Sequence, residues 1–154
     1  MKAYPDTSFL CAIYRTQDNS PKAINWRAAM DEPLHVTRLL LWEFRQSARF
    51  HAFRHSHNRQ VGYPLHEAEK MISDLQDDIV HGLVVSLEPD LTDILFTAER
   101  LSKSRTFSGG HRSFDILHVA TALTLGATDF LTFDSNQAAL ASSEGLATPL
   151  IATP

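Results

Sequence analysis

Short apolar runs alternate with longer amphipathic stretches along the chain. Apolar residues at helical spacing, such as Ala68, Ile72 and Leu75, predict helices, whereas short β-branched and apolar runs predict strands. The expected strands are residues 2–5, 34–37, 83–87 and 129–133, with a last apolar segment at 146–151. The expected helices are residues 7–14, 20–30, 38–57, 64–81, 91–103, 114–125 and 136–142.

Local signals mark where several of these helices begin and where one of them ends. Ser20 followed by Pro21 is typical of a helix start, and Thr37 and Ser113 are suited to cap the helices that follow them. Residues 104–112 are rich in small and basic side chains, and we expect them to form a loop.

Strands that alternate with helices indicate an α/β protein whose parallel sheet is covered by helices on both faces. We expect three layers, α/β/α, with a central parallel sheet of about four to five strands. Because no repeat or linker-like stretch interrupts the pattern, we expect a single domain over residues 1–154. Sheets of this kind bind ligands outside the carboxyl ends of their strands. Residues that directly follow a strand are therefore the first candidates for chemistry.

The composition is that of an ordinary soluble protein. Apolar residues make up 44% and charged residues 21% of the chain, which argues against a disordered or fibrous protein. The longest uncharged apolar run, residues 39–42, is too short to cross a bilayer, and Cys11 has no second cysteine for an internal disulfide. We therefore expect a cytoplasmic protein without membrane association. The net charge of −4 means that a polyanionic ligand has to be met by local basic residues or by bound cations.

Asp6 and Asp134 directly follow the first and the last expected strand. In a parallel sheet both side chains emerge at the same edge. Each of them also precedes a helix, so each has a structural explanation as a helix N-cap.

Glu43 and Asp115 lie on helix faces that are expected to pack inward. Leucines at positions i−4 and i−3 from Glu43 place its carboxylate along an apolar stripe, where an acid is costly unless it is paired or binds a metal. Asp115 shares a smooth apolar face with Val119, although its place in a first helical turn also suits the helix dipole. The structural alternative for Glu43 is a rotation of its helix, residues 38–57, that leaves the carboxylate in water.

Together, the four carboxylates predict a cation site at one edge of the sheet. Acids that converge repel one another, so a folded site needs cations between them. Hard oxygen ligands select magnesium or manganese over zinc. Bound cations also supply the positive charge that a phosphate group requires, which favours a nuclease.

The chain carries Asp-Thr-Ser at 6–8, a glutamate inside an apolar helix, Ser-Phe-Asp-Ile-Leu-His-Val-Ala-Thr-Ala-Leu at 113–123, and Thr-Phe-Asp at 132–134. This order of motifs resembles the PIN domain family, and within it the VapC-type ribonuclease toxins of bacterial toxin–antitoxin pairs. The resemblance covers nearly the whole chain, and its last two motifs are the most specific. Two features depart from compact members: residues 45–63 are longer and more basic, and Pro5 precedes the first aspartate.

The resemblance implies an endoribonuclease that hydrolyses RNA phosphodiester bonds with Mg²⁺ or Mn²⁺ held by Asp6, Glu43, Asp115 and Asp134. It also implies that Thr7 or Ser8 supports the first aspartate, and we expect Thr132 to support the site from the last strand. A homodimer and inhibition by a cognate antitoxin are further implications. We expect Asp6 and Asp115 to be the main ligands, with the other two acids acting directly or through metal-bound water.

The stretch at residues 45–59 is basic and contains interleaved aromatic residues, a pattern typical of segments that follow a nucleic-acid backbone. The candidate RNA contacts in it are Arg45, Arg49 and Arg54. A solvated helix face, with its aromatic residues in the core or in a dimer contact, is the alternative. Arg112, beside Asp115, is a further candidate for a phosphate contact, and a plain surface loop is the favoured alternative there. The spacing of His51 and His55 also permits zinc, but no cysteine or HExxH pattern accompanies it, which favours solvated histidines.

Two other functions remain open at this point. One is a PIN-type nuclease that processes RNA without an antitoxin, and the other is a non-catalytic RNA-binding or dimerisation module. A phosphotransfer receiver is disfavoured because the paired acids after the first strand and the late lysine of that class are missing. His118 is expected to pack with its ring nitrogens hydrogen-bonded.

Overall fold

The computed structural model describes residues 2–151, and both ends of the domain expected over residues 1–154 lie outside the described residues. Its strands are β1 (Ala3–Pro5), β2 (Leu34–Thr37), β3 (Val84–Leu87) and β4 (Asp129–Leu131). Its helices are α1 (Thr7–Tyr14), α2 (Ser20–Ala28), α3 (Arg38–His57), α4 (Leu65–Val80), α5 (Leu91–Gly109), α6 (Ser113–Thr124) and α7 (Ser135–Ser143). This alternation confirms the predicted α/β class.

The strands form two parallel pairs in the middle of the molecule. β1 pairs with β4 and β2 pairs with β3, while β1 and β2 lie side by side, which gives the order β3-β2-β1-β4. Tyr4 and Thr37 join the two pairs through a hydrogen bond of 3.0 Å between their hydroxyl groups. Ala147, in the last apolar segment, adds a single parallel bridge to Asp129. The central parallel sheet is thus confirmed.

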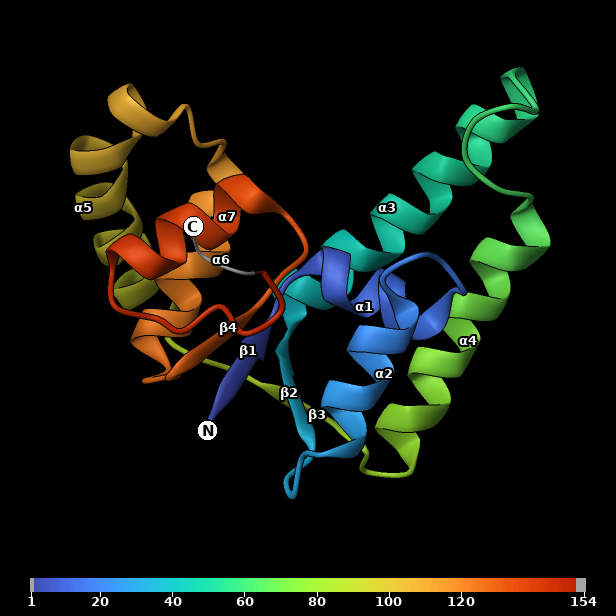
Figure 1. The fold of residues 1–154 in the computed structure, drawn as a ribbon, viewed down its shortest axis with the longest axis horizontal. Helices are drawn as coiled ribbons and strands as arrows, with labels where there is room; N and C mark the ends of the chain where they lie inside the picture. Colours follow the sequence, from blue (N-terminus) through green and yellow to red (C-terminus); the bar gives the residue numbers. More distant parts are fainter. Residues whose placement is uncertain (1, 152–154) are drawn as a thin grey trace.

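Helices cover both faces of the strands, as Figure 1 shows. Helices α1 to α4 pack together on one side, and α5 to α7 pack together on the other. The long helices α3 and α4 lie against each other and project beyond the strands (Figure 1). Large, fully buried side chains from both sides, among them Phe9, Phe44, Met71, Leu101 and Leu140, fill the layers between strands and helices. The three-layer architecture is therefore the expected one.

Pro5 is compatible with this sheet because its backbone nitrogen faces away from β4, the strand with which β1 forms hydrogen bonds. The N–H of the next residue, Asp6, donates to the carbonyl of Leu131 on the β4 side, at 3.0 Å. Successive residues of a strand face opposite sides, so the nitrogen of Pro5 faces β2. Within residues 2–151, β1 and β2 form no hydrogen-bonded ladder. The missing donor of proline therefore costs no ladder hydrogen bond.

Helix α5 is longer than the sequence predicts. It continues to Gly109, so the loop expected at residues 104–112 is wrong over most of its length. Arg105, in the added turns, donates from Nε to Glu144 Oε1 at 3.0 Å and from Nη2 to the carbonyl of Ser143 at 3.2 Å. These contacts to the end of α7 stabilise turns whose small and polar residues have only a modest helix propensity.

Among residues 2–151, no helix combines the length and the apolar character needed to cross a membrane.

Candidate active site

Asp6 lies between β1 and α1 and is fully buried. Its Oδ1 accepts from the Ser8 hydroxyl at 2.6 Å and from the Phe9 N–H at 3.0 Å, and its Oδ2 accepts from the Thr132 hydroxyl at 2.5 Å. Burial raises the pKa of Asp6 above its ordinary value, and the hydrogen bonds of Ser8, Thr132 and Phe9 oppose that rise. The N-cap explanation is correct, and the residue also occupies the expected strand end.

Glu43 projects from α3 toward α1 and α6. The Thr7 hydroxyl donates to its Oε2, and His118 Nε2 donates to the same oxygen at 2.7 Å. The side chain of Glu43 is 25% exposed, whereas that of His118 is 1% exposed. Burial raises the pKa of Glu43, but the hydrogen bond and charge of His118 and the Thr7 hydroxyl together bring it below its ordinary value. Glu43 is therefore held as a carboxylate by two neighbouring elements.

Asp115 and Asp134 each stabilise the start of a helix. Asp115 Oδ2 accepts from the N–H of Arg112 at 3.1 Å, as part of a capping box in which Arg112, rather than Ser113, is the N-cap of α6. Asp134 Oδ1 accepts from two N–H groups in the first turn of α7, at 2.8 and 3.0 Å. Asp134 is exposed, and its own N–H donates to the Thr132 hydroxyl at 2.9 Å.

Three of the four acids line one open pocket at the carboxyl ends of β1 and β4: Asp6, Glu43 and Asp134. We call it the acid pocket. Thr7, Ser8 and Arg112 are also part of its wall. Asp115 is not in the wall, although Arg112, whose N–H donates to the Asp115 carboxylate, is. In the described part of the chain, no three acidic, histidine or cysteine side chains are grouped closely enough to hold a metal ion.

The chemistry of the free oxygens of these acids, though not their spacing, suits a hard cation. Within residues 2–151, Glu43 Oε1, Asp115 Oδ1 and Asp134 Oδ2 have no hydrogen-bond partner from the protein. Both oxygens of Asp6 are used, but a carboxylate has about four acceptor positions. A set made only of carboxylate and hydroxyl oxygens suits Mg²⁺ or Mn²⁺.

The predicted RNA contacts are widely separated. Arg112 lies in the wall of the acid pocket. Arg45 donates to Gln76 Oε1 of α4 at 3.3 Å, and Arg49 and Arg54 are exposed on α3. Of the four arginines, the structure brings only Arg112 to the acids.

Ser47 and His51 are among the wall residues that sequence reasoning did not assign to the site. Both follow Glu43 on α3 at steps of four residues, so they lie on the same helical face. The same spacing was the signal that could have identified them. His118 packs inside as expected, but only its Nε2 is hydrogen-bonded, since Nδ1 has no partner in the described chain.

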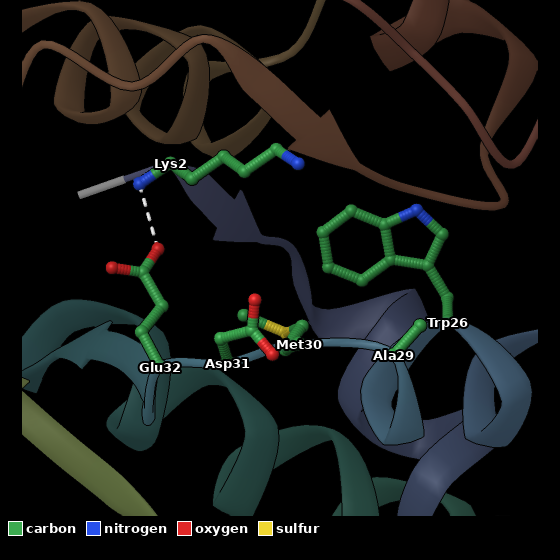
Figure 2. A pocket seen from close by; sticks show the side chains of 6 residues that line it. All are labelled: Lys2, Trp26, Ala29, Met30, Asp31 and Glu32. Carbon is green, nitrogen blue, oxygen red and sulfur yellow. Dashed lines mark hydrogen bonds between the residues drawn. The ribbon is translucent and has the colours of Figure 1, made fainter.

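A different hollow lies at the opposite ends of the strands, where β1 begins (Figure 2). The residues around it are Lys2, Trp26, Ala29, Met30, Asp31 and Glu32. Glu32 Oε1 accepts from the backbone N–H of Lys2 at 2.8 Å. This hollow contains none of the predicted site residues, and ligands of parallel sheets bind at the other edge.

Comparison with known proteins agrees with this geometry. The PIN domain family model matches residues 3–142. A search of curated protein sequences finds no match. Among solved structures, the chain is similar to the Mycobacterium tuberculosis toxin VapC20, described as cleaving the Sarcin-Ricin loop, with 16% identity and a TM-score of 0.65 over 95% of this chain and 97% of that one. It is also similar to VapBC-1 from nontypeable Haemophilus influenzae, with 16% identity and a TM-score of 0.62 over 96% of each chain. The chain belongs to the PIN domain family.

Proposed function

We propose that this protein is a metal-dependent endoribonuclease and the toxin of a toxin–antitoxin pair. The observation that carries the proposal is the acid pocket, where segments far apart in the sequence place Asp6, Glu43 and Asp134 around one opening. Membership of the PIN family and the fold shared with VapC20 support the same function.

In this proposal, Asp6 and Asp115 would hold Mg²⁺ or Mn²⁺, with Glu43 and Asp134 acting as ligands or through bound water. Asp115 lies outside the wall of the acid pocket but bonds to Arg112 within it, and it would offer its free Oδ1. When bound there, the ion would supply Lewis-acid chemistry, polarising a phosphate oxygen and lowering the pKa of a water molecule. Thr132 and Ser8 orient Asp6, while His118 and Thr7 orient Glu43. Arg112 is placed to contact the phosphate backbone of the RNA.

Cleavage of mixed cellular RNA by the purified, partner-free chain tests the proposal. We expect discrete cleavage with Mg²⁺ or Mn²⁺, no cleavage with EDTA, and no cleavage by Asp115→Asn in any condition. Added Mn²⁺ should also raise the melting temperature of the wild type, because an ion that binds only the folded state stabilises it by about 2.7 kcal/mol at 100 times its Kd. A folded protein that binds Mn²⁺ but cuts no RNA would instead support the non-catalytic binding module.

The partners in this proposal are an RNA substrate, a cognate antitoxin and a second copy of the chain. The proposal also includes a cytoplasmic location and a single domain over residues 1–154.

For the homodimer, the support is an apolar surface at the start of α5. Leu91, Leu95 and Phe96 are 60%, 51% and 80% exposed there, and Leu39 of α3 lies beside Leu91 in one hollow. Exposed apolar surface of this kind marks an interface. Light scattering of Phe96→Asp against the wild type tests it: a wild type that is already monomeric contradicts the dimer.

A further inference from the structure

A second hollow opens beside the acid pocket, between α1, α3 and the start of α4. Its wall includes Cys11, Arg15, Gln17, His51, Tyr63 and Met71. Cys11, Gln17 and His51 also belong to the wall of the acid pocket, so the two spaces adjoin. Glu43 and His51 are eight residues apart on α3, which corresponds to about 12 Å along the helix. A flanking nucleotide of the same RNA strand can therefore reach the second hollow.

The turn between α3 and α4 forms part of the wall of this hollow and lies close against α3. Gly62 has φ +69°, and a Cβ added to it would lie 2.1 Å from the backbone oxygen of His51. This close approach presses the turn onto α3. Tyr63 then stacks on the His51 ring, with ring centroids 5.1 Å apart and an interplanar angle of 13°.

Two polar atoms in this wall lack partners. The Tyr63 hydroxyl and His51 Nδ1 are both shielded from solvent, and neither has a hydrogen-bond partner among residues 2–151. Tyr63 as a whole is only 7% exposed. A buried polar atom without a partner is costly, and native proteins rarely keep one without a reason. A ligand that enters the hollow deeply enough to reach them would satisfy both atoms with donors and acceptors of its own.

Arg15 adds a positive charge to the same wall. Its guanidinium carbon lies 4.6 Å from the centre of the Tyr63 ring, and its Nε donates to Glu67 Oε2 at 2.8 Å. In the described chain, its two terminal nitrogens have no hydrogen-bond partner. They remain available for a phosphate oxygen, which a guanidinium binds well.

We propose that this hollow binds the base of the nucleotide next to the scissile phosphate, and that Tyr63 and His51 read its hydrogen-bonding edge. Its volume of about 220 Å³ is below that of pockets for drug-sized ligands, which suits one planar ring system. Protein groups commonly recognise an unstacked RNA base through hydrogen bonds to its edges and aromatic contacts. The inference rests on the proposed ribonuclease function and adds a specificity-determining site to it.

Sequencing of the cleavage products of a randomised RNA pool tests this inference, using wild type, Tyr63→Phe and Tyr14→Phe. Tyr63→Phe keeps the ring and removes only the unpartnered hydroxyl. We expect the wild type to prefer certain bases at one position beside the cut, and Tyr63→Phe to lower that preference by about fivefold, the scale of one hydrogen bond. Its melting temperature should be equal to that of the wild type or higher, because no protein hydrogen bond is lost and a costly buried hydroxyl is removed. Tyr14→Phe is the matched control: its hydroxyl donates to Asp78 at 2.8 Å, so it should lose stability and keep the base preference.

The outcomes separate this inference from the proposed function. If the wild type cleaves RNA and Tyr63→Phe shows the same base preference, the base site is overturned and the nuclease is still supported. If the wild type does not cleave, binding of a fluorescent RNA oligonucleotide decides. If the wild type binds the RNA and Tyr63→Phe binds it more weakly, the RNA site is supported and the nuclease is overturned. If both proteins bind equally, or if neither binds, both proposals are overturned.

Discussion

We expect Asp6→Asn to lower the rate of metal-dependent RNA cleavage by on the order of 10³-fold, equal to about 4 kcal/mol of transition-state stabilisation. Asparagine keeps the size of the side chain and an oxygen that can accept from the Phe9 N–H, but it removes the negative charge that a cation requires. Burial raises the pKa of Asp6, so the charged form is disfavoured in the fold. A neutral side chain relieves that cost, which offsets the loss of one acceptor oxygen for the Thr132 hydroxyl, and the melting temperature should stay close to that of the wild type.

Initial rates on an RNA substrate and thermal unfolding together check this prediction. Asp129→Asn is the matched control because Asp129 begins β4, at the end of the strand remote from the acid pocket. It should leave the cleavage rate unchanged. Full activity in Asp6→Asn would remove Asp6 from the mechanism. Loss of activity together with a much lower melting temperature would show a structural role instead.

Gly62→Ala should reduce the free energy of unfolding by about 2–4 kcal/mol. The substitution combines the cost of a left-handed backbone at an alanine with the overpacking of a Cβ against the backbone of α3. Urea unfolding of the variant and the wild type measures the difference. The displaced turn should also carry Tyr63 away from His51.

Gly82→Ala separates these two contributions. Gly82 has φ +74°, and an added Cβ there would have no neighbour within 4 Å. It therefore carries only the backbone cost, about 1–2 kcal/mol. If the two variants were destabilised equally, the contact between the turn and α3 would contribute nothing measurable.

The sequence predicts the central part of this fold well because local signals and tertiary packing agree there. Thr37 caps α3 as expected, with its hydroxyl accepting from the Leu40 N–H at 3.4 Å, and both bounds of that helix are the predicted ones. The agreement fails at the end of α5, where the ion pairs of Arg100 and Arg105 with Glu144 stabilise the last turns. Periodicity within one helix contains no information about a partner 39 or 44 residues away.

The candidate site shows the same limit. Strand ends and helix faces were sufficient to select Asp6, Glu43 and Asp134 as neighbours, because the carboxyl ends of parallel strands meet at one edge. The pairing of Glu43 with His118 depends on how α3 and α6 are placed, which no local pattern specifies. The last predicted strand was also too long, because Thr132 turns out of β4 to donate to Asp6.

That bond between Thr132 and Asp6 spans 126 positions of the chain, and it has a consequence for synthesis. A ribosome adds about 5–20 residues per second, so Asp6 leaves the exit tunnel on the order of ten seconds before its partner. Throughout that interval the nascent chain lacks β4, the strand that pairs with β1. Contacts this distant in sequence form late, because the intervening chain must be ordered first. A nascent chain without β4 therefore also lacks the Thr132 hydroxyl that holds Asp6, and the wall of the acid pocket is complete only after β4 and the residues that follow it have been made.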